Sequence, residues 1–158
     1  PDVYGLPAKN LFGVFGTTWY YKFDLPGVKE FNAKYAKMYP DTKMKVPGNV
    51  FYNGYWATRS LLEAIEAAGT TENHAVIKQL ENLRISAKTR MQHDEAFMNA
   101  KSHQMQQTVY LATANLGSGD KDDMFQIVAS ASPAKVKDAS SEETCKLESL
   151  ADTPKYTP

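Results

Sequence analysis

The sequence predicts an α/β fold that is incomplete as a single domain. Residues 11–21 are rich in aromatic and β-branched side chains, and residues 28–83 hold three segments with helical periodicity. Several short extended segments follow residue 84. One strand followed by three helices is only half of an α/β layer arrangement. A parallel strand needs neighbouring strands for its backbone hydrogen bonds, and this segment does not provide them. We therefore expect the remaining strands to lie upstream in a longer polypeptide.

The first strand is predicted at residues 11–21, with the sequence LFGVFGTTWYY. Gly5 and Pro7 precede it, and the turn-forming sequence DLPG follows at residues 24–27. A run of aromatic and β-branched residues between turn signals is typical of a buried strand.

A first helix is predicted to start at Val28, with charged residues between its apolar positions. It should end before Pro40, because the residue that precedes a proline disfavours helical backbone. Residues 40–49 combine prolines, a glycine and lysines, so they predict a surface connector. The apolar positions of this helix are Val28, Phe31, Tyr35 and Met38.

Two more helices are predicted after the connector. The second starts near Val50 and ends at Gly69, which suits a left-handed C-terminal residue, and Thr70 and Thr71 offer an N-cap for the third. The second helix should have a broad apolar face of Tyr52, Tyr55, Leu61, Leu62, Ile65 and Ala68. The third should bury Val76, Ile77, Leu80 and Leu83.

Extended segments are predicted at residues 87–91, 96–98, 107–113 and 124–129. A Gly-Ser-Gly-Asp turn separates the last two, which favours a hairpin. From residue 132 onward the apolar residues become rare and polar residues dominate, as in a tail that needs another surface to pack on.

Composition excludes several classes of protein. The chain has 158 residues, 42% of them hydrophobic, and its 18 basic side chains balance 18 acidic ones. A net charge of zero provides no long-range attraction for nucleic acid or anionic lipid, so we expect no nucleic-acid partner. The N-terminus lacks an initiator methionine and the regions of a signal peptide, which suggests a processed chain.

No residue pattern indicates catalysis or a metal site. Cys145 is the only cysteine and has acidic neighbours, which disfavour the thiolate. It is a candidate for pairing with a cysteine elsewhere in a longer chain. His74, His93 and His103 lack the spacing of a zinc helix, and no nucleophile motif or phosphate-binding loop is present. We therefore predict no catalytic residue, no metal and no cofactor.

Five segments occur in an informative order: residues 13–16 (GVFG), 31–40, 52–57 (YNGYWA), 61–69 (LLEAIEAAG) and 102–104 (SHQ). Together they resemble the C-terminal part of the periplasmic solute-binding proteins of branched-chain amino acid type ABC importers, the type I periplasmic binding protein family. The Gly-Tyr-x-Ala start of a long helix and the His-Gln pair are the most specific pieces. Many relatives have an aspartate where this chain has a serine before that pair.

The resemblance implies a two-lobed fold with three-layer α/β/α lobes that close on a ligand about a hinge. It assigns residues 5–97 to the first ligand-binding lobe and residues 98–131 to strands that cross toward the second, and residues 132–158 form the C-terminal tail. The implied function is not enzymatic. The protein would be periplasmic, with a small-molecule ligand, a membrane ABC permease and the remainder of its own polypeptide as partners. The alternative is a ligand-sensing domain of a receptor or transcriptional regulator with the same fold.

Two segments are candidates for ligand contact. The end of the first strand, residues 18–21, should face the cleft, since ligands in open α/β sheets lie beyond the carboxyl ends of the strands. The start of the second helix offers backbone N–H groups to a carboxylate, and the resemblance points to the residues just before its Gly-Tyr-x-Ala sequence. The two segments could converge, and an amino acid, an amide and an aromatic carboxylate are all open as the ligand. The alternative is that the aromatic residues belong to the core. The candidate ligand-binding residues are Trp19, Tyr20, Phe51, Tyr52 and Asn53.

Overall fold

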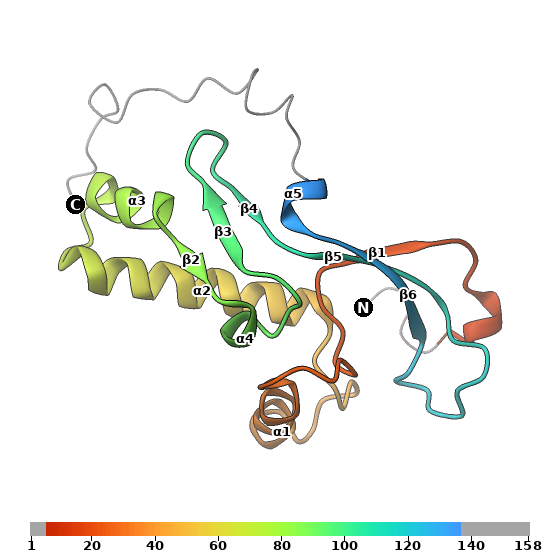
Figure 1. Ribbon diagram of the computed structural model, residues 1–158. Helices are drawn as coiled ribbons and strands as arrows, with labels where there is room; N and C mark the ends of the chain where they lie inside the picture. The colour runs from red at the N-terminus through yellow and green to blue at the C-terminus, as the bar shows by residue number, and fades with distance from the viewer. Residues whose placement is uncertain (1–5, 137–158) are drawn as a thin grey trace.

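The computed structural model describes residues 6–136, and its elements form two connected groups (Figure 1). In one group the long helix α2 (Asn49–Ala68) runs along a small sheet and is contacted by α3 (Asn73–Glu81). In the other group a second sheet lies beside the start of α2. None of the helices within residues 6–136 is long and apolar enough to span a membrane.

Each sheet has three strands, and every strand pair is antiparallel. One sheet has the order β1 (Phe15–Thr17), β5 (Val109–Ala114), β6 (Phe125–Ala131), and the other β2 (Arg84–Ile85), β3 (Ala96–Asn99), β4 (Gln104–Gln106). The expected mixture of helices and strands is confirmed, as is the hairpin of β5 and β6. The expectation that the first strand is parallel to its neighbours is wrong, because β1 pairs in the antiparallel direction with β5 from the far end of the chain.

The first strand is shorter and more exposed than predicted. It covers Phe15–Thr17 only, whereas Phe12 and Val14 have 84% and 64% of their surface exposed. The Thr17 hydroxyl donates to the Trp19 carbonyl and accepts from the Trp19 N–H, so the backbone turns out of the sheet at this point. The prediction of a buried strand over residues 11–21 was therefore wrong.

The first helix, α1, has the bounds predicted from the sequence, Val28–Met38. It begins at Gly27, whose φ of 88° lies in the left-handed region that favours glycine. It ends at Tyr39, directly before Pro40, because the proline ring disfavours helical backbone at the preceding residue.

The end of α2 agrees with the prediction, whereas the residue that caps the start of α3 differs from it. Gly69 ends α2 with a φ of 64° and donates its N–H to Ile65 and Glu66, as predicted. The N-cap of α3 is Glu72 instead of either predicted threonine, since its carboxylate accepts from two backbone N–H groups of the first turn. Within α3 only Val76 of the predicted core is fully buried; Ile77, Leu80 and the following Leu83 are half-buried.

Residues 87–91 are not extended, contrary to prediction. They form the short helix α4 (Ala87–Arg90), capped by the Ser86 hydroxyl, which accepts from the Thr89 N–H. Met91 ends it with a left-handed φ of 56°. A second short helix, α5 (Pro133–Val136), follows β6, and a 3-10 turn, η1 (Ala8–Asn10), precedes β1. The rest of the predicted tail, with Cys145, lies outside the described residues.

The core lies where α1, α2 and α4 meet the chain after β1. Its aromatic centre is Trp19, Tyr52 and Trp56, each at most 2% exposed. Phe31 of α1 packs edge-on against both Trp19 and Tyr52. The other buried members of this cluster are Val28, Ile85 and Met91.

Only part of the apolar face predicted for α2 is buried. Leu61 and Leu62 are 46% and 59% exposed, because no described element covers that side of the helix. Burial is confined to one residue per helical turn, on the side toward the core and α3. The buried residues are Tyr52, Trp56, Ser60 and Ala64.

Candidate functional site

The candidate site forms where the chain leaves β1 and meets the start of α2. The Thr18 backbone N–H and hydroxyl both donate to Oδ1 of Asn49, at 3.2 Å and 2.7 Å, and the hydroxyl also lies 3.1 Å from Oδ1 of Asn53. Asn49 is the first residue of α2, and its N-cap residue, Gly48, provides no side-chain cap. The two predicted segments are therefore in contact in the structure.

Aromatic stacking strengthens this junction. The rings of Trp19 and Tyr52 are nearly parallel, with an interplanar angle of 3° and centroids 4.8 Å apart. The Tyr52 hydroxyl donates to the backbone carbonyl of Arg90. Burial raises the pKa of Tyr52 despite the opposing charge of Arg90, so the phenol is neutral.

Tyr20 connects the same segment to the hairpin of β5 and β6. Its hydroxyl donates to Oδ1 of Asp123 at 2.9 Å and accepts from the Phe125 N–H at 3.3 Å. Burial is the main cause that raises the pKa of Tyr20, and the Asp123 carboxylate adds to it. Burial opposes ionisation of Asp123, but hydrogen bonds from Lys22, at 2.7 Å, and Tyr20 outweigh it and lower the pKa of this carboxyl.

A cavity of about 540 Å³ lies between the Trp19 segment, the loop before α2 and the second sheet. This volume lies in the range of ordinary small-molecule sites. Its walls come from residues 15–21, from the connector and first turn of α2 at residues 44–51, and from the hairpin of β5 and β6. The wall residues from the hairpin are Ala112, Asp122, Met124, Phe125 and Ile127, and Tyr35 of α1 completes the lining.

Three wall residues present buried polar atoms that have no hydrogen-bond partner within residues 6–136. They are Nε1 of Trp19, the hydroxyl of Tyr21 and Oδ1 of Asp122. Buried polar groups are normally paired, so unpaired ones at a cavity wall are suited to a bound solute or ordered water. Burial, followed by the nearby carboxylates of Asp120 and Asp123, raises the pKa of Tyr21 and keeps its hydroxyl a donor.

The structure brings all five predicted residues to the junction, but in different surroundings. Trp19, Tyr20 and Phe51 line the cavity, and Phe51 packs edge-on against Tyr35, with centroids 4.8 Å apart. Tyr52 is fully buried behind Trp19, and Asn53 contacts Thr18. Contact of any of them with a solute stays a prediction.

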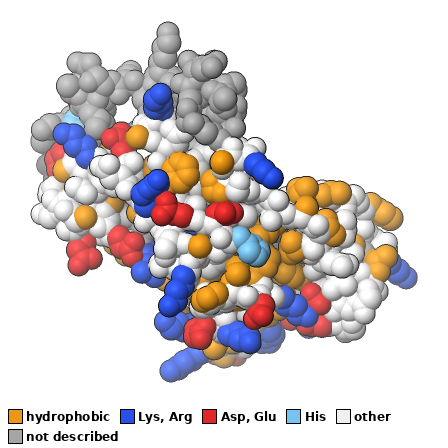
Figure 2. Space-filling view, viewed as in Figure 1, with side chains coloured by type: hydrophobic (Ala, Val, Ile, Leu, Met, Phe, Trp, Pro, Cys, Tyr) orange, Lys and Arg blue, Asp and Glu red, His pale blue; other side chains and the backbone are white. Residues whose placement is uncertain are grey.

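Sequence reasoning missed most of the other walls. The connector residues Met44, Val46 and Pro47 line the cavity, although the connector has no periodicity that would indicate a buried role. Met124 and Phe125 line it from the hairpin, which the sequence predicted as a hairpin but could not place beside β1. Figure 2 shows hydrophobic side chains gathered on the side of the molecule that holds the β1, β5, β6 sheet.

His93 and His103 form side-chain hydrogen bonds and do not line this cavity. Nδ1 of His93 lies 2.9 Å from the Tyr110 hydroxyl, and Nε2 of His103 lies 2.9 Å from Oε1 of Glu81. Within residues 6–136 no group of three or more histidine, cysteine or acidic residues has the geometry to hold a metal ion.

Comparison with known proteins decides the family. The family model described as "Periplasmic binding protein" matches residues 1–122. The chain belongs to the periplasmic binding protein family. No curated protein sequence matches it significantly. The type I periplasmic binding protein fold predicted above is confirmed by solved structures of periplasmic binding proteins.

Three solved structures illustrate the likeness. A periplasmic binding protein from Burkholderia mallei has a TM-score of 0.73 and 22% identity over 91% of this chain and 36% of its own. The amino acid ABC transporter substrate-binding protein from Pseudomonas fluorescens Pf-5 has a TM-score of 0.71 and 21% identity over 90% of this chain and 36% of its own. A branched-chain amino acid ABC transporter periplasmic ligand-binding protein from Burkholderia xenovorans has a TM-score of 0.67 and 17% identity over 85% of this chain and 34% of its own. This periplasmic binding protein chain therefore spans about a third of their length.

Proposed function

We propose that this chain belongs to an extracytoplasmic solute-binding protein that captures a small organic solute between two lobes and delivers it to a membrane ABC permease. The proposal contains no covalent step, in keeping with the solute-binding proteins whose structures the chain resembles. Two of those structures come from amino acid transporters, which makes an amino acid the first solute class to test.

One observation carries the proposal: the segment 18–21 is attached to both groups of elements and lines the cavity between them. Thr18 is hydrogen-bonded to Asn49 at the start of α2, and Tyr20 is hydrogen-bonded to Asp123 of the hairpin. Because this segment is bonded to both groups of elements, a change in the distance between the two groups would move it. It is thus suited to a protein that closes on its ligand about a hinge.

The cavity favours a small solute with a carboxylate or amide and an apolar body. The first turn of α2 contributes Asn49, Val50 and Phe51 to the wall, and the N-terminus of a helix attracts negative charge. The unpaired Tyr21 hydroxyl and Trp19 indole N–H are additional donors, and the aromatic walls provide flat apolar contact. An amino acid, an amide and an aromatic carboxylate all satisfy this description.

The mechanism that we propose is a population shift. Solute contacts that exist only in the closed state move the equilibrium toward closure, and the permease recognises the closed shape. The division into residues 5–97 of the first lobe and residues 98–131 of the crossing strands remains part of the proposal. In its support, the β1, β5, β6 sheet draws strands from both ranges.

A thermal-shift screen with leucine, 4-hydroxybenzoate and acetamide on the full-length protein tests solute capture. A solute that binds only the native state raises the melting temperature. The solute that does so should also reduce the radius of gyration in solution scattering. Tyr21→Phe should weaken its binding, because it removes a hydroxyl donor from the cavity wall, and Tyr39→Phe is the matched control.

A binding solute that leaves the radius of gyration unchanged would contradict the proposal. Closure without delivery to a permease would instead support the alternative, a ligand-sensing domain of a receptor or regulator. A membrane-spanning helix or DNA-binding segment in a longer chain would favour that alternative.

A further inference from the structure

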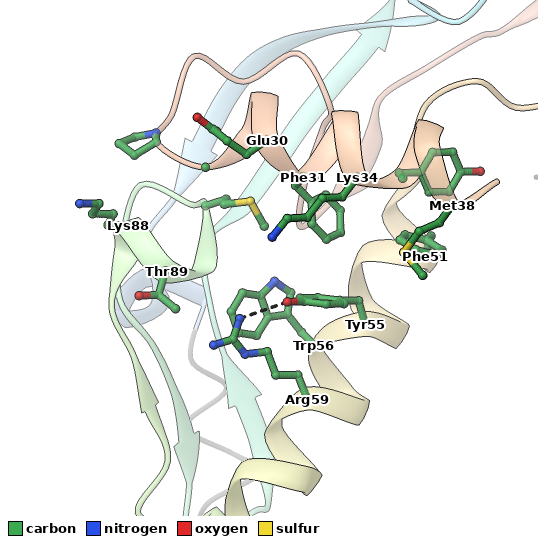
Figure 3. A pocket seen from close by; sticks show the side chains of 14 residues that line it. Glu30, Phe31, Lys34, Met38, Phe51, Tyr55, Trp56, Arg59, Lys88 and Thr89 are labelled. Atoms are coloured by element: carbon green, nitrogen blue, oxygen red, sulfur yellow. Dashed lines mark hydrogen bonds between the residues drawn. The ribbon is translucent and has the colours of Figure 1, made fainter. Parts of the chain in front are cut away.

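A second cavity, of about 520 Å³, lies on the other side of Phe51, between α1, α2 and α4 (Figure 3). The two cavities have only Tyr35 and Phe51 in common as wall residues. None of the three unpaired polar groups of the candidate solute site lines it. It is therefore a separate site, and its lining has a different chemical character.

The second cavity is rich in N–H donors that lack an acceptor. Trp56 is 2% exposed, and its indole Nε1 has no hydrogen-bond partner within the described residues. In Figure 3 this nitrogen lies on the edge of the ring that faces α1, and the Lys34 side chain extends from α1 toward Trp56 and Arg59. Within residues 6–136 Lys34 makes no ion pair.

Arg59 of α2 lines the second cavity on the side opposite Lys34 (Figure 3). Its Nε donates to Oε1 of Glu63 at 2.7 Å, and Nη1 donates to the Tyr55 hydroxyl at 3.1 Å. A guanidinium has about five N–H donors, so these two bonds leave donors free. The guanidinium also lies 5.1 Å from the Trp56 ring, which fixes its plane beside the cavity.

Within residues 6–136 the acidic residues near the cavity leave Lys34, the Trp56 indole N–H and the remaining Arg59 donors without an acceptor. Glu63 is paired with Arg59 and does not line the cavity. Glu30 lines the rim, but Figure 3 shows its carboxylate turned away from Lys34, Trp56 and Arg59. Lys88 lines the rim as well, and its side chain also points outward in Figure 3, so Lys34 and Arg59 are the basic groups of the lining that lie beside Trp56. The cavity therefore favours a ligand that accepts hydrogen bonds and carries negative charge.

The remaining walls are apolar and flat. Phe31, Phe51 and Tyr55 contribute rings, and Met38 and Met91 contribute flexible thioether side chains. Inorganic phosphate would leave these walls without a partner, whereas a carboxylate on an aromatic or branched body would contact both the donors and the rings. We propose that this cavity is a second binding site, for a small organic carboxylate with a flat apolar body, held by Lys34, Arg59 and the Trp56 indole N–H.

The two tryptophans of the chain allow a direct test, because Trp19 lines the first cavity and Trp56 the second. Phenylacetate is titrated into the full-length protein with isotope-labelled tryptophan, and the indole N–H signals of Trp19 and Trp56 are followed by nuclear magnetic resonance. The signals are assigned with Trp19→Phe or Trp56→Phe, whichever variant keeps the folded spectrum. We expect a saturable shift of the Trp56 signal, since roughly 10 mM ligand would fill most of even a ~1 mM site.

Lys34→Met should weaken this binding roughly three- to tenfold, because it removes a charged donor and keeps the length of the side chain. Lys37→Met is the matched control, since Lys37 is an exposed lysine of α1 that lines neither cavity, and it should leave the affinity unchanged. Phenylacetamide, which has the same shape without the charge, should shift the Trp56 signal weakly.

Three results would overturn the proposal: no shift of the Trp56 signal with phenylacetate, an equal shift with phenylacetamide, or an equal shift with inorganic phosphate alone. A shift produced only by a glutamate-rich peptide would also overturn it, and would assign the cavity to an acidic segment of a partner protein. A shift of the Trp19 signal alone would place phenylacetate in the first cavity.

Discussion

The guanidinium of Arg90 is buried against the ring of Trp56, 5.1 Å from its centroid, and no carboxylate within residues 6–136 forms an ion pair with it. Arg90 is 3% exposed, and burial lowers its pKa. Its Nη2 donates to Oε1 of Gln107 at 2.6 Å, and the Tyr52 ring lies 5.3 Å away. The charge is thus stabilised by aromatic rings and an amide instead of an anion.

Arg90→Met and Arg90→Ala should differ in the free energy of unfolding. Methionine keeps the apolar stem that packs on Tyr52 and Trp56 and removes a buried charge, so its cost should be less than ~1 kcal/mol. Alanine leaves a cavity and should cost about 2 to 4 kcal/mol. Urea denaturation of both variants measures the difference, and equal losses would show that the charge itself stabilises the fold.

The junction between β1 and α2 should depend on the Thr18 hydroxyl. Thr18→Val keeps the shape of the side chain and removes its hydrogen bonds to Asn49 and Asn53. We expect a loss of about 1 to 2 kcal/mol in the free energy of unfolding. Thr58→Val, at an exposed position of α2, is the control and should change stability by less than ~0.5 kcal/mol. Similar losses in the two variants would assign the effect to valine in general.

Gly27 and Gly54 should respond in opposite directions to alanine. Gly27 has a φ of 88°, and an added Cβ would lie 3.2 Å from Cγ of Met91, so Gly27→Ala should cost at least ~1 kcal/mol. Gly54 lies inside α2 with open space around it, so Gly54→Ala should stabilise by roughly 0.5 to 1 kcal/mol. Thermal unfolding of both variants checks the signs, and a neutral Gly27→Ala would refute the left-handed start of α1.

Stability should fall in alkaline solution. The folded protein raises the pKa of Tyr20, Tyr21 and Tyr52 above the ordinary value of 10.0, chiefly by burial. These tyrosines stabilise the fold fully below pH 10, and this stability is lost as pH rises from 10 toward the folded pKa values, because the unfolded chain releases the protons first. Urea denaturation at increasing pH measures the slope of the free energy of unfolding against pH.

Tyr20→Phe should reduce that slope and should also remove the hydrogen bond to Asp123, at a cost of about 0.5 to 1.5 kcal/mol near neutral pH. Tyr39→Phe is the control, because Tyr39 is exposed and should leave the slope unchanged. If the loss of stability with rising pH were equally steep in the unmodified protein, Tyr20→Phe and Tyr39→Phe, buried tyrosines would not be its cause.

Turn and cap residues in the sequence correctly predicted the helix ends that depend on neighbouring residues alone. The bounds of α1 follow from the turn before it and from Pro40 after it, and Gly69 ends α2 as expected. Residues 87–91 show the limit of such signals, since the helix there depends on the Ser86 cap and on the left-handed Met91. A run of five residues is too short for periodicity to distinguish a helix from a strand.

The sequence by itself determined the mixture of helices and strands, the bounds of α1 and the end of α2, because these follow from spacing, turns and caps within a few residues of each position. The family resemblance indicated the segment before the Gly-Tyr-x-Ala sequence. Only the tertiary structure decided that β1 pairs with β5, that Trp19 stacks on Tyr52 and that the connector and the hairpin wall a cavity. Such contacts join residues that are distant along the chain, and their free energy depends on which surfaces become buried together. A single sequence read in short windows does not contain that information.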